Sequence, residues 1–229
     1  MKRVIIAISL SLLFAANIDA KKKPFGQNLT WELSNGVLTI SGKGDMPNCH
    51  NSGRKIKALL TGELSPNNVP WFKSGESIRK IVIEEGVTSI GDYVFTCYFD
   101  FNKSQTVPYT ILQEVVFPRS LRTIGVGAFK GCDNLNSIVF NDIGENEDQT
   151  LTIKDYAFES CKIEQLILPS YVTIIGEGAF RLNPLTTISI PKTTQTIGEH
   201  IFDRGEKEYQ GIILSLFQIW KILYLEEQV

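Results

Sequence analysis

The sequence has few of the residues on which active sites and metal sites most often depend. Its 229 residues include two histidines and four cysteines. It lacks the metalloprotease, serine-hydrolase and phosphate-loop motifs, and its cysteines and histidines do not have the spacing of a zinc site. We therefore expect no catalytic residue, no metal site and no cofactor, and the sequence favours a protein that is not an enzyme.

The sequence also has no excess of charge of one sign. The 23 Lys and Arg residues are balanced by 25 Asp and Glu residues, which leaves a formal charge of −2. Because nothing in the sequence forms a basic face, nucleic acid is not an expected partner. The apolar runs at the two ends of the chain are shorter than the roughly 20 residues that a membrane-spanning helix needs.

The first 20 residues have the pattern of a signal peptide. Lys2 and Arg3 precede an apolar run over residues 4–16, and Ala20 supplies a small residue at a plausible cleavage site. This pattern predicts export, so the expected location is secreted or cell-surface.

We divide the chain into a signal peptide (1–20), an N-terminal cap with its loop (21–77), a repeat region (78–205) and a C-terminal segment (206–229). Asn35 and Gly36 separate two runs of alternating apolar and polar residues, which is the strongest short signal for a β-hairpin. We interpret this hairpin as a cap, because a stack of repeats exposes the core of its first unit. Trp71 is expected to dock the cap onto that unit.

One phrase recurs along the repeat region, and its clearest copy is SYVTIIGEGAF at residues 170–180. Successive copies of its aligned isoleucine are 34, 29, 22 and 22 residues apart. The basic period is therefore 22 residues, with insertions at 98–109 and 141–149. A period of about 20–29 residues with a short apolar strand is typical of leucine-rich repeats. The aligned isoleucines are Ile90, Ile124, Ile153, Ile175 and Ile197.

A six-residue strand pattern precedes each phrase, and its positions one, four and six are apolar in all five copies. Alternate strand residues face opposite sides, so we expect these positions to point inward and positions three and five to point outward. The copies begin at Ile78, Leu112, Leu135, Ile163 and Leu185.

The second half of each unit ends in an aromatic residue that we expect to stack in a core column. A glycine four residues earlier is expected to supply a bend in four of the units. The aromatic residues are Phe95, Phe129, Phe158, Phe180 and Phe202, and the glycines are Gly91, Gly125, Gly176 and Gly198.

Three of the four cysteines share one place in the repeat. Cys97, Cys132 and Cys161 each follow the aromatic position by two or three residues, and Asn183 holds that place in the next unit. A small polar group that recurs in this way predicts a buried ladder in which each side chain bonds neighbouring backbone. We favour free thiols in this ladder, and a disulfide between units is the alternative that export permits.

Taken together, three features resemble the BspA-like leucine-rich-repeat surface proteins. They are the phrase VTSIGDYVF followed by Cys97, the strands that end in proline, and the leader NLTWELSNGVLTISGKGDMP before Pro70-Trp71. The resemblance implies a β-rich α/β repeat fold, a solenoid of about five coils, and a bacterial protein that is secreted or displayed on the surface. It also implies adhesion, because better-known relatives bind host matrix and plasma proteins.

The candidate binding residues lie on the outward strand positions and in the first insertion. Position five forms an apolar stripe, which is either a binding ridge or a consequence of β propensity. Aromatic residues in the insertion are either recognition anchors or a loop packed on itself. The candidates are Val82, Val116, Val139 and Ile167 at position five, Glu114 and Gln165 at position three, and Tyr98, Phe99 and Phe101 in the insertion.

The expected function is recognition of a protein or glycan, such as a host extracellular-matrix component, through the sheet face and the inserted loops. The alternative is a structural or self-associating part of a surface assembly. Residues 211–225 are mostly apolar. They predict a helix that covers the last unit, a helix that binds a membrane surface or partner, or a tail unrelated to the repeats; membrane contact is expected only there.

Overall fold

The structure is a computed structural model that describes residues 22–49, 69–97, 99–100, 105–106, 111–141 and 149–203. The predicted signal peptide (1–20) and C-terminal segment (206–229) lie outside the described residues. So do the candidate residues Tyr98 and Phe101.

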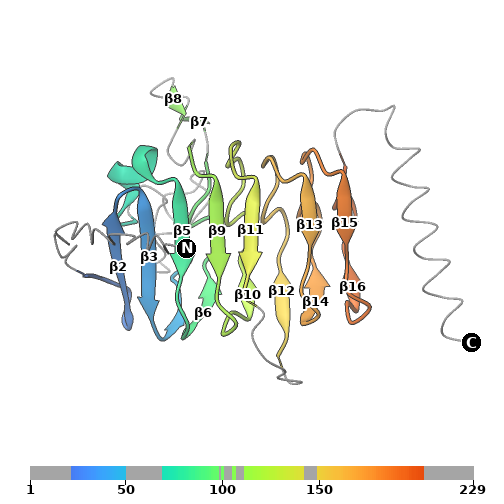
Figure 1. The fold of residues 1–229 in the computed structure, drawn as a ribbon, viewed down its shortest axis with the longest axis horizontal. Coiled ribbons are helices and arrows are strands. Elements are labelled where there is room, and N and C mark those ends of the chain that lie inside the picture. The colour runs from blue at the N-terminus through green and yellow to red at the C-terminus, as the bar shows by residue number, and fades with distance from the viewer. Residues whose placement is uncertain are drawn as a thin grey trace, which may run out of the picture.

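The described residues form short strands and one 3₁₀-helix, labelled as in Figure 1. They are β1 (Lys23–Phe25), β2 (Leu29–Ser34), β3 (Val37–Gly42), β4 (Gly44–Asp45), η2 (Phe72–Ser77), β5 (Lys80–Ile83), β6 (Val87–Ile90), β7 (Phe99–Asp100), β8 (Gln105–Thr106), β9 (Glu114–Phe117), β10 (Thr123–Ile124), β11 (Ser137–Phe140), β12 (Leu151–Ile153), β13 (Gln165–Ile167), β14 (Val172–Ile175), β15 (Thr187–Ser189) and β16 (Thr196–Ile197).

Two rows of strands run along the solenoid and enclose the core between them (Figure 1). The first row contains the sheet β1-β2-β3-β5-β9-β11 and, beyond it, the separate pair β13-β15. The second row is one sheet in the order β16-β14-β12-β10-β6-β4. We call each first-row strand with its return strand a coil, and number coils 1–5 by β5, β9, β11, β13 and β15.

The expectation of an α/β repeat was too broad for the described part of the chain. Each coil returns through a strand of the second row, and the described helical structure is η2 alone. The fold is therefore a β-rich repeat with parallel sheets. The return segments are extended because β-branched residues such as Val172, Ile174 and Ile175 favour a pleated strand.

The parallel register places equivalent residues of successive coils side by side. Ile81 pairs with Val115, and Val115 pairs with Ile138. Residues at positions one, four and six are almost fully buried in coils 1, 2 and 4, as predicted. In coil 3, Ile138 and Phe140 are only half-buried, because β11 has no paired strand on its far side. In coil 5, Ile188 is 39% exposed at the end of its two-stranded sheet.

The predicted aromatic column is present in the first four coils. Phe95, Phe129, Phe158 and Phe180 stack with ring centroids 5.1, 5.2 and 5.3 Å apart and planes within 13°. This spacing is close to the roughly 4.8 Å between neighbouring strands, so one ring fits each coil. The fifth member, Phe202, is half-buried.

Trp71 extends this column toward the N-terminal hairpin. Its ring stacks on Phe95 at 5.7 Å and meets Phe25 and Trp31 edge-on at 4.6 and 5.9 Å. The expected docking role of Trp71 is thus confirmed by its contacts. The β2–β3 hairpin turns at Asn35 and Gly36, both with positive φ, and β3 continues the sheet by pairing in parallel with β5.

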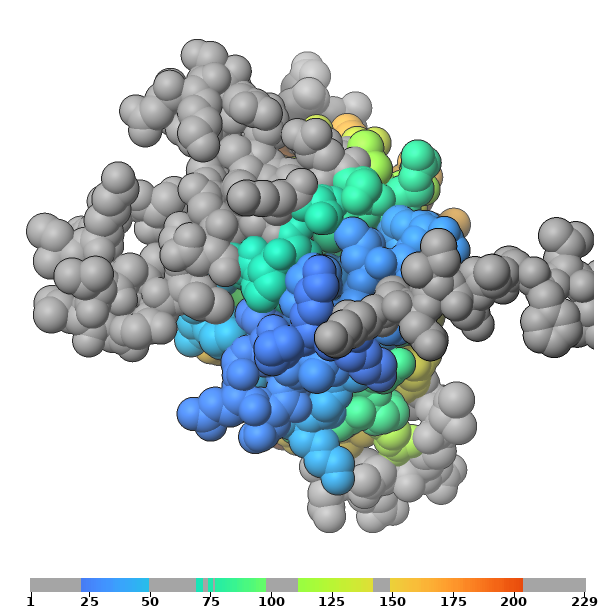
Figure 2. Space-filling model, turned by 90° about the vertical axis from the view of Figure 1, so that its left-hand side faces the viewer, coloured from blue at the N-terminus to red at the C-terminus, as the bar shows by residue number. Residues whose placement is uncertain are grey.

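Figure 2 looks along the solenoid at the end formed by β1–β3, coloured blue, with the segment around η2 beside them. The hairpin therefore lies at the end of the stack where the sequence predicts a cap.

The expected role of the repeated glycines was wrong. Gly125 and Gly176 do not have positive φ; they are needed because a Cβ would lie 2.6 and 2.5 Å from backbone nitrogens of the preceding coil. The left-handed residue comes two positions later, and it is Gly127 or Gly178 in coils 2 and 4. Coils 1, 3 and 5 place Tyr93, Tyr156 and His200 there with φ of 55–57°.

We predict that Phe129→Ala lowers the free energy of unfolding by about 3–5 kcal/mol, the usual loss for a buried phenylalanine. Phe202→Ala is the matched control, because this half-buried ring occupies the same repeat position and leaves a smaller cavity. Urea unfolding followed by circular dichroism measures both. Equal losses of unfolding free energy for the two variants would contradict the assignment of Phe129 to a buried aromatic column.

Candidate functional site

The outward stripe at position five forms as predicted in the first three coils. Val82 pairs with Val116, and Val116 pairs with Val139, so their side chains lie on one face in register. Thr39 of the hairpin continues the row by pairing with Val82. The repeat register therefore builds a continuous β-branched row across four strands.

Exposure along this stripe rises toward the C-terminal coils. Val82 and Val116 are half-buried, Val139 is 39% exposed and Ile167 is 66% exposed. Ile167 is the most exposed large hydrophobic side chain among the described residues. It lies on β13, in the separate two-stranded sheet, so the structure does not pair it with Val139.

At position three, Glu114 already has a partner. Its Oε1 lies 3.1 Å from Nζ of Lys80, the residue opposite it on β5. A pair this exposed contributes roughly 0–1 kcal/mol, so a ligand could replace Lys80 at little cost. Gln165 is exposed on β13, across the break from Ser137.

The structure says less about the first insertion. Phe99 lies in β7, whose backbone pairs antiparallel with β8 through Phe99–Thr106 and Asp100–Gln105. Because Tyr98 and Phe101 are outside the described residues, the predicted aromatic anchor stays a prediction.

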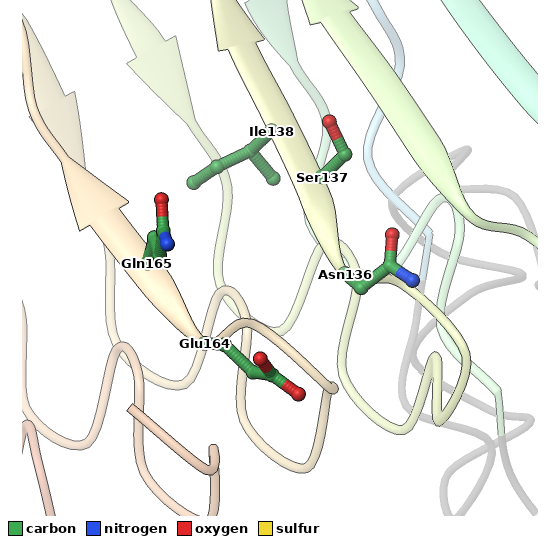
Figure 3. A pocket seen from close by; sticks show the side chains of 5 residues that line it. All are labelled: Asn136, Ser137, Ile138, Glu164 and Gln165. Atoms are coloured by element: carbon green, nitrogen blue, oxygen red, sulfur yellow. The ribbon is translucent and has the colours of Figure 1, made fainter. Parts of the chain in front are cut away.

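A cavity of about 370 Å³ lies between β11 and β13 (Figure 3). We call it the β11–β13 cavity. Four of its five lining residues were not candidates from the sequence. The available signal was the insertion that begins directly after β11 and interrupts the regular turn of coil 3. The lining residues are Asn136, Ser137, Ile138, Glu164 and Gln165.

In coils 2–5, a column of alternating charge runs along the position after the phenylalanine. Glu159 of coil 3 is buried and contacts Lys130 of coil 2. Arg181 of coil 4 lies 3.5 Å from Glu159 and 3.8 Å from Asp203 of coil 5. Since each charge has an opposite charge on a neighbouring coil, this column is explained by packing of the repeats.

The predicted polar ladder is confirmed, and all four cysteines are free and buried. The Cys132 thiol donates to the Phe95 carbonyl and the Cys161 thiol to the Phe129 carbonyl. Asn183 Nδ2 donates to the Phe158 carbonyl in the same way. Each side chain thus bonds backbone of the preceding coil, as the repeat position predicts.

The thiols in this environment resist ionisation. Burial, with a smaller contribution from the nearby Asp92 carboxylate, raises the pKa of the Cys49 thiol to about 12. Burial likewise raises the pKa of Cys132, to which hydrogen bonding with Cys97 adds, and burial raises that of Cys161. Because the thiolate is the reactive form, these cysteines are poor nucleophiles at neutral pH.

Within the described ranges, no group of three His, Cys, Asp or Glu side chains gathers where a metal ion would be held. In the same ranges, no helix has the length and apolar character of a membrane span.

The chain belongs to the BspA-type leucine-rich-repeat region family. The family model matches residues 69–107 and 104–215 and counts six copies of the repeat. No curated protein matches the sequence.

A solved structure of a bacterial leucine-rich-repeat protein shares the fold, and two others are less similar. A protein from Eubacterium ventriosum has a TM-score of 0.58 at 25% identity over 77% of this chain, which spans 39% of that protein. The pneumococcal vaccine antigen PcpA gives 0.45 at 16% identity, over 81% of this chain and 48% of its own. A leucine-rich-repeat protein from T. pallidum gives a TM-score of 0.44 at 18% identity, over 80% of this chain and 67% of its own.

We predict that the buried thiols react with iodoacetamide only when the chain unfolds. At about pH 8 the native chain should resist labelling at Cys49, Cys132 and Cys161, while the chain in denaturant should be labelled at all three, as mass spectrometry of peptides would show.

The raised pKa values of the buried thiols also predict how the stability of the fold depends on pH. The folded thiols keep their protons above the ordinary pKa of 9.0, whereas the thiols of the unfolded chain ionise there. The free energy of unfolding is therefore unaffected by thiol ionisation below pH 9 and falls as pH rises from there toward about 12. Native labelling of Cys132 as fast as in denaturant would contradict the ladder.

Proposed function

We propose that the protein is a non-enzymatic binding protein, exported to the bacterial surface, that recognises a protein or glycan through the outward face of its first row of strands. The observation that carries this proposal is the apolar stripe of Val82, Val116 and Val139 at position five, with Ile167 at 66% exposure beyond the break between the sheets. An exposed row of large apolar side chains on an otherwise polar face is typical of an interaction surface.

Three further observations support the proposal. The chain belongs to the BspA-type leucine-rich-repeat region family, and the sequence resemblance to that family implies display at the bacterial surface. The parallel register repeats the same outward position on the neighbouring strands of coils 1–3, which suits an extended ligand. Finally, the sequence pattern of residues 1–20 favours export.

A host matrix protein or a surface glycan is the ligand class that this location favours. The position-three residues add polar contacts beside the stripe, since Glu114 and Gln165 lie one alternate position away from Val116 and Ile167. We assign the stripe the apolar contact area and assign these side chains the role of directing hydrogen bonds.

A second candidate function is self-association in a surface assembly. Ile188, at an inward strand position, is 39% exposed on β15 at the end of its described sheet. Mass measured by light scattering over a range of concentrations separates the two functions. The measured mass of a ligand-binding monomer stays constant, whereas the measured mass of a self-associating chain rises with concentration.

The prediction for the proposed function is that Val116→Glu combined with Ile167→Glu weakens binding by about tenfold or more, because the bound ligand would bury two unpaired charges. The assay is a screen of the full chain against arrayed host matrix proteins and glycans.

Ile174→Glu is the matched control, because Ile174 is 37% exposed on β14 in the other row of strands. This control should bind like the original chain. Hits that survive the double change would show that the sheet face is not the site.

A further inference from the structure

The contact between coils 3 and 4 lacks hydrogen bonds that the other first-row contacts make. In each of the others, the N–H groups at strand positions two and three both donate to one carbonyl of the preceding strand. At the coil 3–coil 4 contact, the N–H groups of Glu164 and Gln165 make no such bond to the Asn136 carbonyl, although all three residues are described. The bonds present elsewhere are Arg79 and Lys80 to Gly36, Gln113 and Glu114 to Arg79, Asn136 and Ser137 to Gln113, and Thr186 and Thr187 to Glu164.

The insertion after β11 gives a physical reason for this break. Coils 1, 2, 4 and 5 close a tight turn after the strand, for example Val172 N–H to the Pro169 carbonyl. In coil 3 the corresponding N–H, that of Leu151, donates to the Tyr171 carbonyl of coil 4 at 2.7 Å. The N–H that follows the insertion is therefore bonded to the next coil.

The break is confined to the first row. In the second row, Gly176 N–H donates to the Ile153 carbonyl at 2.7 Å across the same two coils. At the aromatic edge, Phe158 N–H donates to the Ala179 carbonyl at 2.8 Å, and the Phe158 ring stacks on the Phe180 ring. The gap therefore lies within an otherwise continuous stack. It ends where the Lys162 N–H donates to the Leu135 carbonyl.

The facing strand edges offer backbone groups to the gap. In a parallel strand, alternate residues direct their N–H and C=O groups to opposite neighbours. Ser137 bonds toward β9, so the backbone of Ile138 is directed toward β13. Leu168 bonds toward β15, so Gln165 and Ile167 direct theirs toward β11. Two unpaired edges of the same direction therefore face each other.

The side chains make this gap a polar site with an apolar patch (Figure 3). Ile138 lies between the two strands, while Glu164 and Gln165 extend from the start of β13. The carboxylate of Glu164 is exposed and has no ion-pair partner among the described residues. The cavity of about 370 Å³ is within the roughly 300–1,000 Å³ of sites that hold small ligands or short segments.

We propose that the β11–β13 cavity receives an extended segment of a partner protein, which pairs its backbone with β11 and β13 and places a Lys or Arg beside Glu164. The proposal rests on the proposed binding function and names the partner class at one part of the same face. An extended peptide fits because it carries alternating N–H and C=O groups on both edges, which is what two facing strand edges require. Its side chain at the apolar patch would cover Ile138.

The probe is a library of linear peptides of about ten residues, longer than a typical strand of about 5–6 residues, selected on the full chain. Selected peptides should be rich in Lys or Arg. N-methylation of their central amides should weaken binding by about tenfold or more, because each methyl group removes a donor to a strand edge.

Two pairs of variants locate the peptide. Ser137→Trp fills the cavity mouth and should weaken binding by about tenfold, whereas Thr187→Trp, at the same strand position on exposed β15, should not. Glu164→Lys reverses the exposed charge without touching the core and should also weaken binding. Its control, Glu199→Lys, changes an exposed carboxylate outside the cavity.

If both cavity variants leave peptide binding unchanged, this proposal is overturned. The proposed function nevertheless stands if Val116→Glu combined with Ile167→Glu still weakens matrix or glycan binding. A glycan hit that Ser137→Trp abolishes, with no peptide selected, would mean that the cavity binds sugar and would also overturn it. A concentration-dependent mass that Ser137→Trp abolishes would make the occupant a second copy of the chain. Failure to select any peptide would equally count against strand pairing.

Discussion

Backbone hydrogen bonding between successive coils is the interaction on which the rest of this structure depends. At the aromatic edge, Phe129 N–H donates to the Ala157 carbonyl and Phe158 N–H to the Ala179 carbonyl, both at 2.8 Å. In the second row, Gly125 N–H reaches the Ile90 carbonyl at 2.9 Å. Because the same bond recurs at the same repeat position, each residue lies beside its equivalents in the neighbouring coils. Side chains are thereby arranged in columns about one strand spacing apart.

This arrangement limits which side chains can occupy a column. Flat rings stack, as the phenylalanines do, and small donors can bond the backbone of the preceding coil, as Cys132 and Asn183 do. Like charges would repel at this spacing, and Glu159 accordingly lies between Lys130 and Arg181. Bulky residues alternate with small ones where rings overlap the next coil: a Cβ on Gly127 would lie 2.5 Å from the Tyr93 ring. The outward stripe differs from these columns because its side chains face solvent rather than another part of the fold.

Features that repeat in the sequence could be predicted from it, and features created by a departure from the repeat could not. The strand positions, the Phe129 column and the Cys132 ladder all follow from residues at a fixed place in each unit. The glycines were misread because a sequence shows that Gly125 has no side chain but not whether φ or a close neighbour requires it; the left-handed position is held by Tyr93 in one coil and Gly127 in the next. The β11–β13 cavity was missed because an insertion reveals only extra length. The sequence does not show that β11 and β13 are unpaired in the folded chain. The returns were expected within an α/β repeat and are strands, since the short β-branched return segments pair across coils.

The central claim is that pairing between coils holds the solenoid together and is interrupted in the first row between coils 3 and 4. Amide hydrogen exchange followed by NMR tests it most directly, because position-three N–H groups are equivalent in every coil. The account predicts slow exchange at Glu114, Ser137 and Thr187, which donate to the preceding strand, and much faster exchange at Gln165, which does not. Equal protection of Gln165 and Glu114 would contradict it, since β13 would then be paired with β11.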